Sequence, residues 1–124
     1  MKLREHYTCP LELVHDMIKG KWKTIIIFQL RNGKQSFSKL HHSINGITQK
    51  MLLEQLHELK VFGLIDKRSY DGYPLKVEYF LTRQGEKMLS AIKIMQEIGI
   101  DYMVEHEQTE ILIDKGISYT QKSK

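Results

Sequence analysis

The sequence predicts a mainly helical α+β fold in which a pair of short helices is followed by a two-stranded hairpin and a long C-terminal helix. Apolar residues recur at helical spacing through residues 36–62, with a break at Asn45-Gly46, and an alternating pattern follows in residues 76–81. A wide apolar helical pattern then occupies residues 83–106. Together these patterns predict the order helix, helix, hairpin, long helix.

The composition fits one compact domain. A chain of 124 residues is expected to bury roughly two-thirds of the surface that its unfolded form exposes, so no disulfide or metal is needed for stability. Cys9 is the single cysteine, which excludes a disulfide within one chain and leaves open a bond between two chains. No apolar run approaches the ~20 residues of a membrane span, and residues 1–6 lack the apolar core of a signal peptide. We therefore expect a cytoplasmic protein without a membrane partner.

The positive charge is concentrated in one part of the chain. The formal net charge is +4, and between Arg31 and Tyr70 seven basic residues face three acidic ones, which leaves twelve of each sign elsewhere. This cluster indicates a polyanionic partner, although a solvated surface explains it equally well.

Two helices are predicted ahead of residue 36. Pro10 suits the first turn of a helix and restricts Cys9 to the extended conformation of an N-cap, which predicts a helix from Pro10 to Ile18. The apolar stretch from Trp22 to Leu30 predicts a buried helix that stops at Asn32-Gly33.

The next two helices form a helix-turn-helix pattern. Ser36 is placed to cap a short helix that Asn45-Gly46 ends, and Thr48 is placed to cap a helix that runs to Phe62. In a helix-turn-helix the first helix braces the second, which enters the major groove of DNA. Helical hairpins also occur in proteins that never meet DNA, so this element alone leaves the function open.

A hairpin follows directly. Gly63 ends the second helix, and a strand-like segment follows from Leu64 to Tyr70. A turn is predicted at Asp71-Gly72, with Pro74 near its tip. The alternating pattern from Lys76 to Leu81 predicts the second strand. A hairpin in this place is the wing of a winged helix, and it carries the cations Lys67, Arg68 and Lys76 toward DNA phosphates. The wing is taken as residues 70–76.

The long helix predicted from Arg83 to His106 begins after the capping residue Thr82. Its apolar residues cover more than half of its circumference, which is more than one small domain easily hides, so we expect part of this face to pack against a second copy. The alternative is that residues 107–124 fold back over it. The expected organisation is a winged-helix domain over residues 1–106, with a dimerisation helix at 83–106, and a partly ordered extension over 107–124.

With these elements in order, the sequence resembles the HxlR-type family of winged-helix regulators, relatives of the MarR-like group, over roughly residues 9–98. The matching phrases are Cys9-Pro10, Gly20-Lys21-Trp22, Phe37-Ser38-Lys39-Leu40, Gly46-Ile47-Thr48-Gln49-Lys50-Met51-Leu52, Leu56-His57-Glu58-Leu59, Gly63-Leu64-Ile65, Val77-Glu78-Tyr79 and Leu81-Thr82-Arg83-Gln84-Gly85. The resemblance implies a homodimer joined through terminal helices that binds a roughly palindromic operator in double-stranded DNA. It implies no particular effector, cofactor or metal.

The chain departs from the family pattern on the DNA-facing side. Leu53, Glu54 and His57 stand where the family often has a polar residue, a glutamine and an arginine, so the operator sequence is not transferable. The wing has Pro74-Leu75-Lys76 where the family usually has two prolines and a basic residue. The chain therefore keeps the cation but loses some of the stiffness that a second proline would give.

The recognition helix supplies the first candidate DNA contacts. At about 100° per residue, Lys50, Glu54 and His57 point nearly opposite the core residue Leu52. The candidates are Thr48, Gln49, Lys50 and His57. The helix start also favours a phosphate, although capping alone explains Thr48. Lys50 can reach a guanine edge or a phosphate and Gln49 is suited to adenine, whereas we expect Glu54 to pair with a base on its own helix.

Outside this helix, Lys39, Arg68 and Lys76 are expected to hold phosphates. Tyr73, at the wing tip, either stacks on a sugar or only shapes the turn.

Cys9 has two interpretations. A thiol at a helix N-terminus is a candidate redox sensor, because the helix dipole favours its thiolate, and a buried cysteine is simply a small apolar residue. Some members of the resembled family sense oxidants through a cysteine near this place, and in others no role has been demonstrated for it.

No metal site or enzyme active site is predicted. His41 and His42 are adjacent, so they point about 100° apart on a helix, and we expect solvated side chains. The sequence has no phosphate-binding glycine loop and no nucleophile elbow. The alternative to a DNA-binding regulator is a winged-helix module that has lost DNA binding and serves protein interaction, which Leu53 and Glu54 on the exposed helix face keep open.

Overall fold

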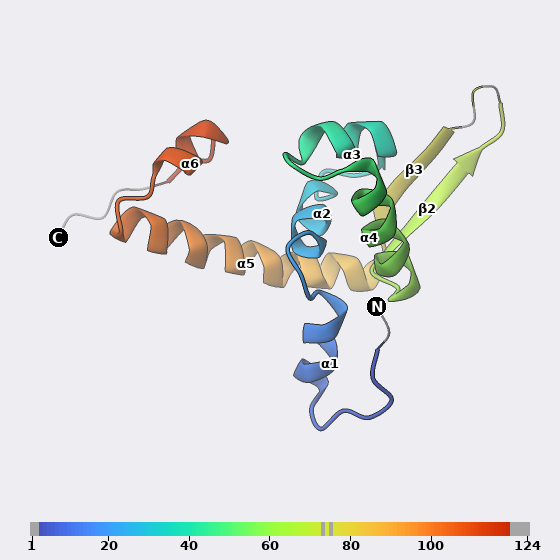
Figure 1. Ribbon diagram of the computed structural model, residues 1–124, viewed down its shortest axis with the longest axis horizontal. Helices are drawn as coiled ribbons and strands as arrows, with labels where there is room; N and C mark the ends of the chain where they lie inside the picture. The colour runs from blue at the N-terminus through green and yellow to red at the C-terminus, as the bar shows by residue number, and fades with distance from the viewer. Residues whose placement is uncertain (1–2, 73, 75, 120–124) are drawn as a thin grey trace. The chain divides into compact units, whose positions relative to one another are not determined.

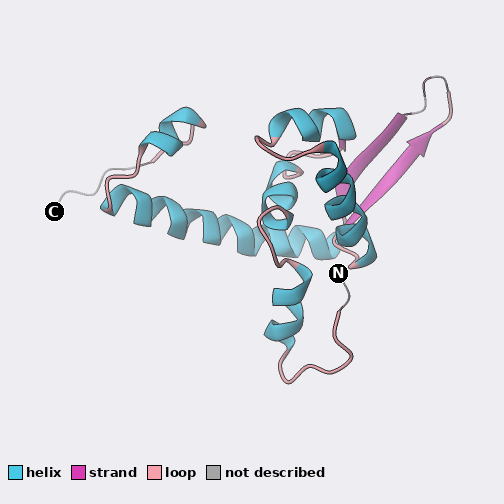
Figure 2. Cartoon of the chain, in the orientation of Figure 1, coloured by secondary structure: helices cyan, strands magenta, loops and turns pink. Residues whose placement is uncertain are grey.

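The computed structural model describes residues 3–72, 74 and 76–119. Figures 1 and 2 show the helices and strands in chain order. They are α1 (Pro10–Met17), α2 (Lys23–Gln29), β1 (Gln35–Ser36), α3 (Phe37–Ser43), α4 (Gln49–Val61), β2 (Ile65–Tyr70), β3 (Lys76–Leu81), α5 (Arg83–Glu105) and α6 (Glu110–Asp114). The mainly helical α+β fold and the order of its predicted elements are confirmed.

The chain forms two compact units, Met1–Leu89 and Ser90–Lys124. The first unit holds α1 to β3 and the start of α5, and the second holds the rest of α5 and α6. Among the described residues, no helix is long and apolar enough to cross a membrane.

The sheet of the first unit has three antiparallel strands in the order β1-β3-β2. The hairpin pairs Ile65 with Leu81 at one end and Tyr70 with Lys76 at the other. The added strand β1 pairs Gln35 with Tyr79 and joins the wing to the start of α3. Two residues are too short for an alternating pattern, which is why the sequence predicts the hairpin and not β1.

The core of the first unit lies between α2, α3, α4 and the base of the hairpin. Ile26 and Ile27 of α2 are fully buried, and the stripe of α4 that the sequence predicts is buried along its length: Leu52, Leu56 and Leu59. Leu40 of α3 and Ile65 of β2 complete this core. The recognition helix is therefore fixed by its apolar side, and its opposite side is free to meet a partner.

Gly85, in the first turn of α5, sits against the chain that leaves α4. A Cβ atom at this position would lie 1.9 Å from the carbonyl oxygen of Leu64, a backbone atom that cannot move aside cheaply. That oxygen accepts from the N–H of Thr82, and the Thr82 hydroxyl accepts from the N–H of Gly85 at 3.2 Å. The predicted cap at Thr82 is confirmed, and it holds the start of α5 against the root of the hairpin.

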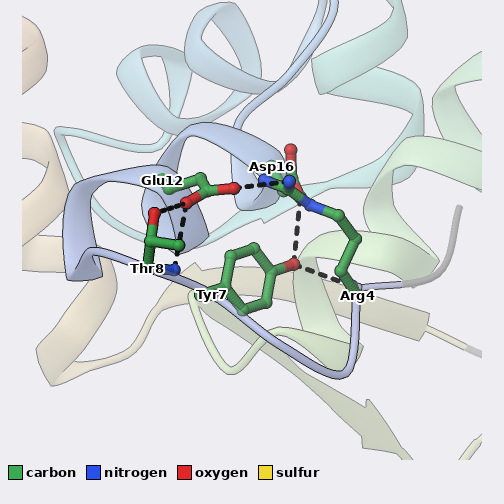
Figure 3. A network of polar contacts seen from close by, with 5 residues as sticks. All are labelled: Arg4, Tyr7, Thr8, Glu12 and Asp16. Carbon is green, nitrogen blue, oxygen red and sulfur yellow. Dashed lines mark hydrogen bonds and ion pairs between the residues drawn. The ribbon is translucent and has the colours of Figure 1, made fainter.

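A polar network ties residues 4–8 to α1 (Figure 3). Arg4 Nε and the Tyr7 hydroxyl each donate to Asp16 Oδ2 at 2.9 Å, and the Thr8 hydroxyl donates to Glu12 Oε2 at 2.7 Å. Arg4 also forms an ion pair with Glu12. The hydrogen bond from Arg4 lowers the pKa of Asp16, and the hydrogen bond from the Thr8 side chain lowers the pKa of Glu12.

The second unit ends its long helix with a chain reversal. Glu107 has a positive φ of 57°, and the N–H of Gln108 donates to the carbonyl of Met103 at 2.7 Å. Helices commonly end on such a left-handed residue. The chain then forms α6, whose Leu112 is buried. The predicted fraying of Thr120–Lys124 falls outside the described residues.

Candidate nucleic-acid interface

The start of α4 is a surface suited to an anion. Thr48 has extended backbone angles and its hydroxyl oxygen accepts from the N–H of Met51 at 3.1 Å, which confirms the predicted cap. The first turn carries no acidic residue, and Gln49 and Lys50 are exposed. Because a capping hydroxyl accepts through its oxygen, its own hydrogen remains able to donate to a phosphate. The positive end of the helix dipole adds to this attraction.

The turn between α3 and α4 is fixed by local bonds. Ser36 caps α3 by accepting from the N–H of Lys39 at 3.2 Å, as predicted. Gly46 adopts a positive φ of 87°, which glycine takes without strain. His41 Nε2 is 3.1 Å from the carbonyl oxygen of Ile47, so this half-buried ring bridges the two sides of the turn. The prediction that His41 is a solvated side chain is therefore wrong.

The outer face of α4 is arranged as the helical spacing predicts. Lys50, Glu54 and His57 are exposed opposite the buried stripe, and the side chain of Leu53 is also largely exposed, at 56%. The expected ion pair of Glu54 on its own helix is not formed with any residue that the structure describes, although Lys50 lies four residues before it. This face thus presents one cation, one anion and one histidine.

A buried ion pair lies under α4, which the sequence analysis does not predict. The Lys23 side chain, 2% exposed, donates from Nζ to Gln55 Oε1 at 2.7 Å and to Glu58 Oε2 at 3.3 Å. Burial by itself would raise the pKa of Glu58, but hydrogen bonds and positive charges, those of Lys23 foremost, together outweigh it, and the pKa lies below its ordinary value. The only sequence signal is a lysine inside an apolar helix. This pair links α2 to the recognition helix.

The hairpin gathers two of its cations around an aromatic ring. The Arg68 guanidinium carbon lies 5.5 Å and Lys76 Nζ 5.7 Å from the centre of the Tyr70 ring. Alternation along β2 puts Arg68 and Tyr70 on one face, and Lys67 on the other. Tyr70 is thus a candidate that the sequence analysis missed, although its spacing of two from Arg68 was a signal for it. Tyr73 lies outside the described residues.

The cations predicted to contact DNA form no ion pair among the residues that the structure describes. Lys39, Lys50, Arg68 and Lys76 are exposed and form no ion pair within the described part of the chain. Their charges are therefore available to a polyanion. Lys39 lies on α3, Lys50 on α4 and the other two on the hairpin, which are the three elements that a winged helix uses to bind DNA.

Cys9 is exposed at the N-cap of α1, and its side chain makes no capping hydrogen bond. Thr8, which precedes Cys9, and Glu12, three residues after it, belong to the polar network of Figure 3. Over the described residues, no three His, Cys, Asp or Glu side chains lie close enough together to hold a metal ion.

These features define the class: a winged helix-turn-helix protein whose recognition helix presents a capped N-terminus and unpaired cations. Residues 17–107 match the HxlR-like helix-turn-helix family, and the chain belongs to this family of transcriptional regulators. It is therefore a DNA-binding regulator and not an enzyme.

Two relatives illustrate the likeness. The chain is 36% identical over 104 residues to the uncharacterized HTH-type transcriptional regulator YkvN of Bacillus subtilis (strain 168), covering 84% of this chain and 87% of YkvN. The crystal structure of a MarR-family transcriptional regulator from Porphyromonas gingivalis W83 superposes with a TM-score of 0.73 at 35% identity, covering 80% of this chain and 97% of that one.

A third similar protein is described as a redox regulator. HypR in its oxidized form superposes with a TM-score of 0.70 at 38% identity, covering 73% of this chain and 94% of that one.

Proposed function

We propose that this chain is a sequence-specific, cytoplasmic transcription regulator that binds a palindromic operator as a homodimer. The observation that carries the proposal is the start of α4, where Thr48, Gln49 and Lys50 surround a helix N-terminus without an acidic residue. His57 extends this surface along α4. Lys39, Arg68 and Lys76 supply phosphate contacts on either side of it, and these contacts position the helix without reading sequence.

The homodimer is supported by the second unit. Four large apolar side chains of α5 are at least half exposed: Ile94 at 58%, Met95 at 50%, Ile98 at 63% and Tyr102 at 57%. The described part of residues 107–124 leaves them uncovered, which goes against the alternative that this segment hides the face. A second copy packing by two-fold symmetry would bury them and would set two recognition helices at a fixed spacing.

The test is the salt dependence of binding to a random DNA duplex, followed by selection of bound sequences from a random pool. A regulator that neutralises several phosphates loses affinity steeply as salt rises, with a slope of roughly −0.9 per phosphate in a log–log plot. Selection is expected to return an inverted repeat. A flat salt response with no enrichment would favour the alternative, a winged-helix module for protein interaction.

We further propose that Cys9 responds to oxidants by joining two chains, since it is the single cysteine and is exposed. Treatment with diamide is expected to give a dimer on a non-reducing gel that dithiothreitol reverses, and to change operator affinity. The Cys9→Ser variant is the control and should do neither. A crosslink that leaves operator affinity unaltered would refute the sensing role.

A further inference from the structure

The far end of the hairpin carries a tyrosine beside two cations. Tyr70 and Lys76 form the last pair of the antiparallel register, and Arg68 lies two residues before Tyr70 on the same strand. Side chains two apart on a strand project from the same face, and so do side chains directly opposite each other on paired strands. The three side chains therefore share one face of the hairpin, and we call them the Tyr70 cluster.

The contacts within the Tyr70 cluster run through the ring. The guanidinium carbon of Arg68 lies 5.5 Å and Lys76 Nζ lies 5.7 Å from the ring centre, both within the reach of about 6 Å of a cation–π attraction. Both cations are exposed, whereas Tyr70 is half-buried. Long cationic side chains cover apolar surface with their stems while their charges stay in water.

An acidic partner is within reach of Arg68 and is not used. Glu78 is directly opposite Arg68 in the register, on the same face of the hairpin. No ion pair joins these two described residues, and the guanidinium lies near the Tyr70 ring instead. An ion pair with Glu78 would cancel the charge of Arg68, whereas a contact with a neutral ring leaves that charge available to a phosphate.

The ring offsets two unfavourable effects of this arrangement. Cations held near each other repel, and long side chains lose rotamer freedom when they are fixed in one place. The electron-rich faces of an aromatic ring attract both charges. Side chains that are already ordered in the free protein lose less entropy when a binding partner arrives.

We propose that Tyr70 is a positioning residue for DNA binding: its ring holds Arg68 and Lys76 together in the free protein, so that both meet the phosphate backbone as one preformed pair. The proposal rests on the function proposed above, in which these two cations contact phosphates. Tyr70 acts through the cations and does not itself contact DNA. Its removal leaves both charges on the chain and takes away only their fixed placement.

The first test needs no DNA. In NMR spectra of the full chain, the methylene protons next to the charged groups of Arg68 and Lys76 are expected upfield of their ordinary positions, because the face of an aromatic ring shields protons above it. The shifts should disappear in Tyr70→Leu and persist in Tyr70→Phe. Ordinary positions in the wild type would overturn the proposal, and this measurement stays decisive even where Tyr70→Leu fails to fold.

The second test measures binding to a random DNA duplex over a series of salt concentrations. Tyr70→Leu is expected to weaken binding about fivefold at 0.15 M salt, with two clusters per dimer. The log–log salt slope should stay unchanged, because both cations still neutralise phosphates in the complex, whereas Arg68→Gln should make it less negative by about 1.8. Tyr70→Phe, which keeps the ring, should recover most of the lost affinity.

The matched control is Phe28→Leu. It removes a ring that lies 4.2 Å from the Arg31 guanidinium carbon, outside the proposed interface, and it should bind the duplex as the wild type does. Equal affinities of Tyr70→Leu and Phe28→Leu would overturn the proposal.

A further variant separates positioning from a direct contact of the ring with DNA. In a chain that already carries Arg68→Gln and Lys76→Gln, Tyr70→Leu should lower the affinity no further, since no cation remains for the ring to hold. The same fivefold loss in that background would show that the ring binds DNA itself, against the proposal. If the wild type shows the NMR shifts and binds no duplex, the holding of the cations by Tyr70 stands and the proposed function is wrong.

Discussion

Replacing Lys50 by alanine is expected to weaken binding to a selected operator by at least about tenfold at 0.15 M salt. Lys50 is exposed in the first turn of α4, is not paired with any described residue, and lies beside the capped helix N-terminus. A homodimer carries two copies of Lys50. If each contacts one phosphate, the log–log salt slope becomes less negative by about 1.8 in total.

The same variant distinguishes a phosphate contact from a base contact. Loss of a phosphate contact weakens operator and random duplex alike, whereas loss of a guanine contact costs roughly 1–3 kcal/mol on the operator and little on random DNA. Lys76→Ala should show a smaller, sequence-independent loss. Lys93→Ala, on α5 outside the proposed interface, is the control. If Lys50→Ala and Lys93→Ala bind the operator equally well, α4 does not bind DNA in the way proposed.

The parts of this interface that the sequence predicts are those set by local chemistry. Ser36 and Thr48 cap their helices through bonds to an N–H three residues on, and such a bond depends on nearby residues alone. The buried stripe of α4 follows from helical spacing, and so does the exposure of Lys50 and His57.

The parts that the sequence does not predict depend on contacts between distant segments. Lys23 and Glu58 are 35 positions apart, and the strand β1 exists only because β3 lies beside it. The pocket that Leu53 of α4 lines together with Lys67 and Tyr79 of the hairpin likewise needs two elements to come together. The sequence analysis predicts that Lys67 and Arg68 both point toward DNA as wing cations. In the register of the hairpin the two side chains lie on opposite faces of β2, as the alternation of side chains along a strand requires.

Replacing Lys23 by methionine is expected to lower the free energy of unfolding by about 3 kcal/mol at pH 7. The change leaves Gln55 without its donor and leaves the Glu58 carboxylate, 18% exposed, without its buried cation. Glu58 is partly exposed and has a further interaction besides Lys23, and both place the expected loss at the low end of the range for a broken buried pair. Denaturant unfolding at one fixed protein concentration measures it, since a dimer's stability varies with concentration.

A double-mutant cycle with Glu58→Gln shows whether the loss comes from the pair. Lys23→Met combined with Glu58→Gln should recover part of the stability that Lys23→Met loses, because no charge is then left buried at α4. If the two losses simply add, the geometry of the pair contributes nothing beyond its separate side chains, and the role assigned to it in holding α4 against α2 is wrong.

The pH dependence gives an independent check on the same pair. In the wild type the folded pKa of Glu58 is lowered, so its contribution to stability is present above the unfolded pKa of about 4.3 and is lost as the pH falls through the folded pKa. In Lys23→Met, loss of the hydrogen bond and charge of Lys23 should raise the folded pKa of Glu58 above its wild-type position, so less stability is lost on acidification than in the wild type. The stability difference between the two proteins should therefore narrow from neutral pH toward pH 4. A difference that stays constant over this range would show that Lys23 acts through packing and not through its charge on Glu58.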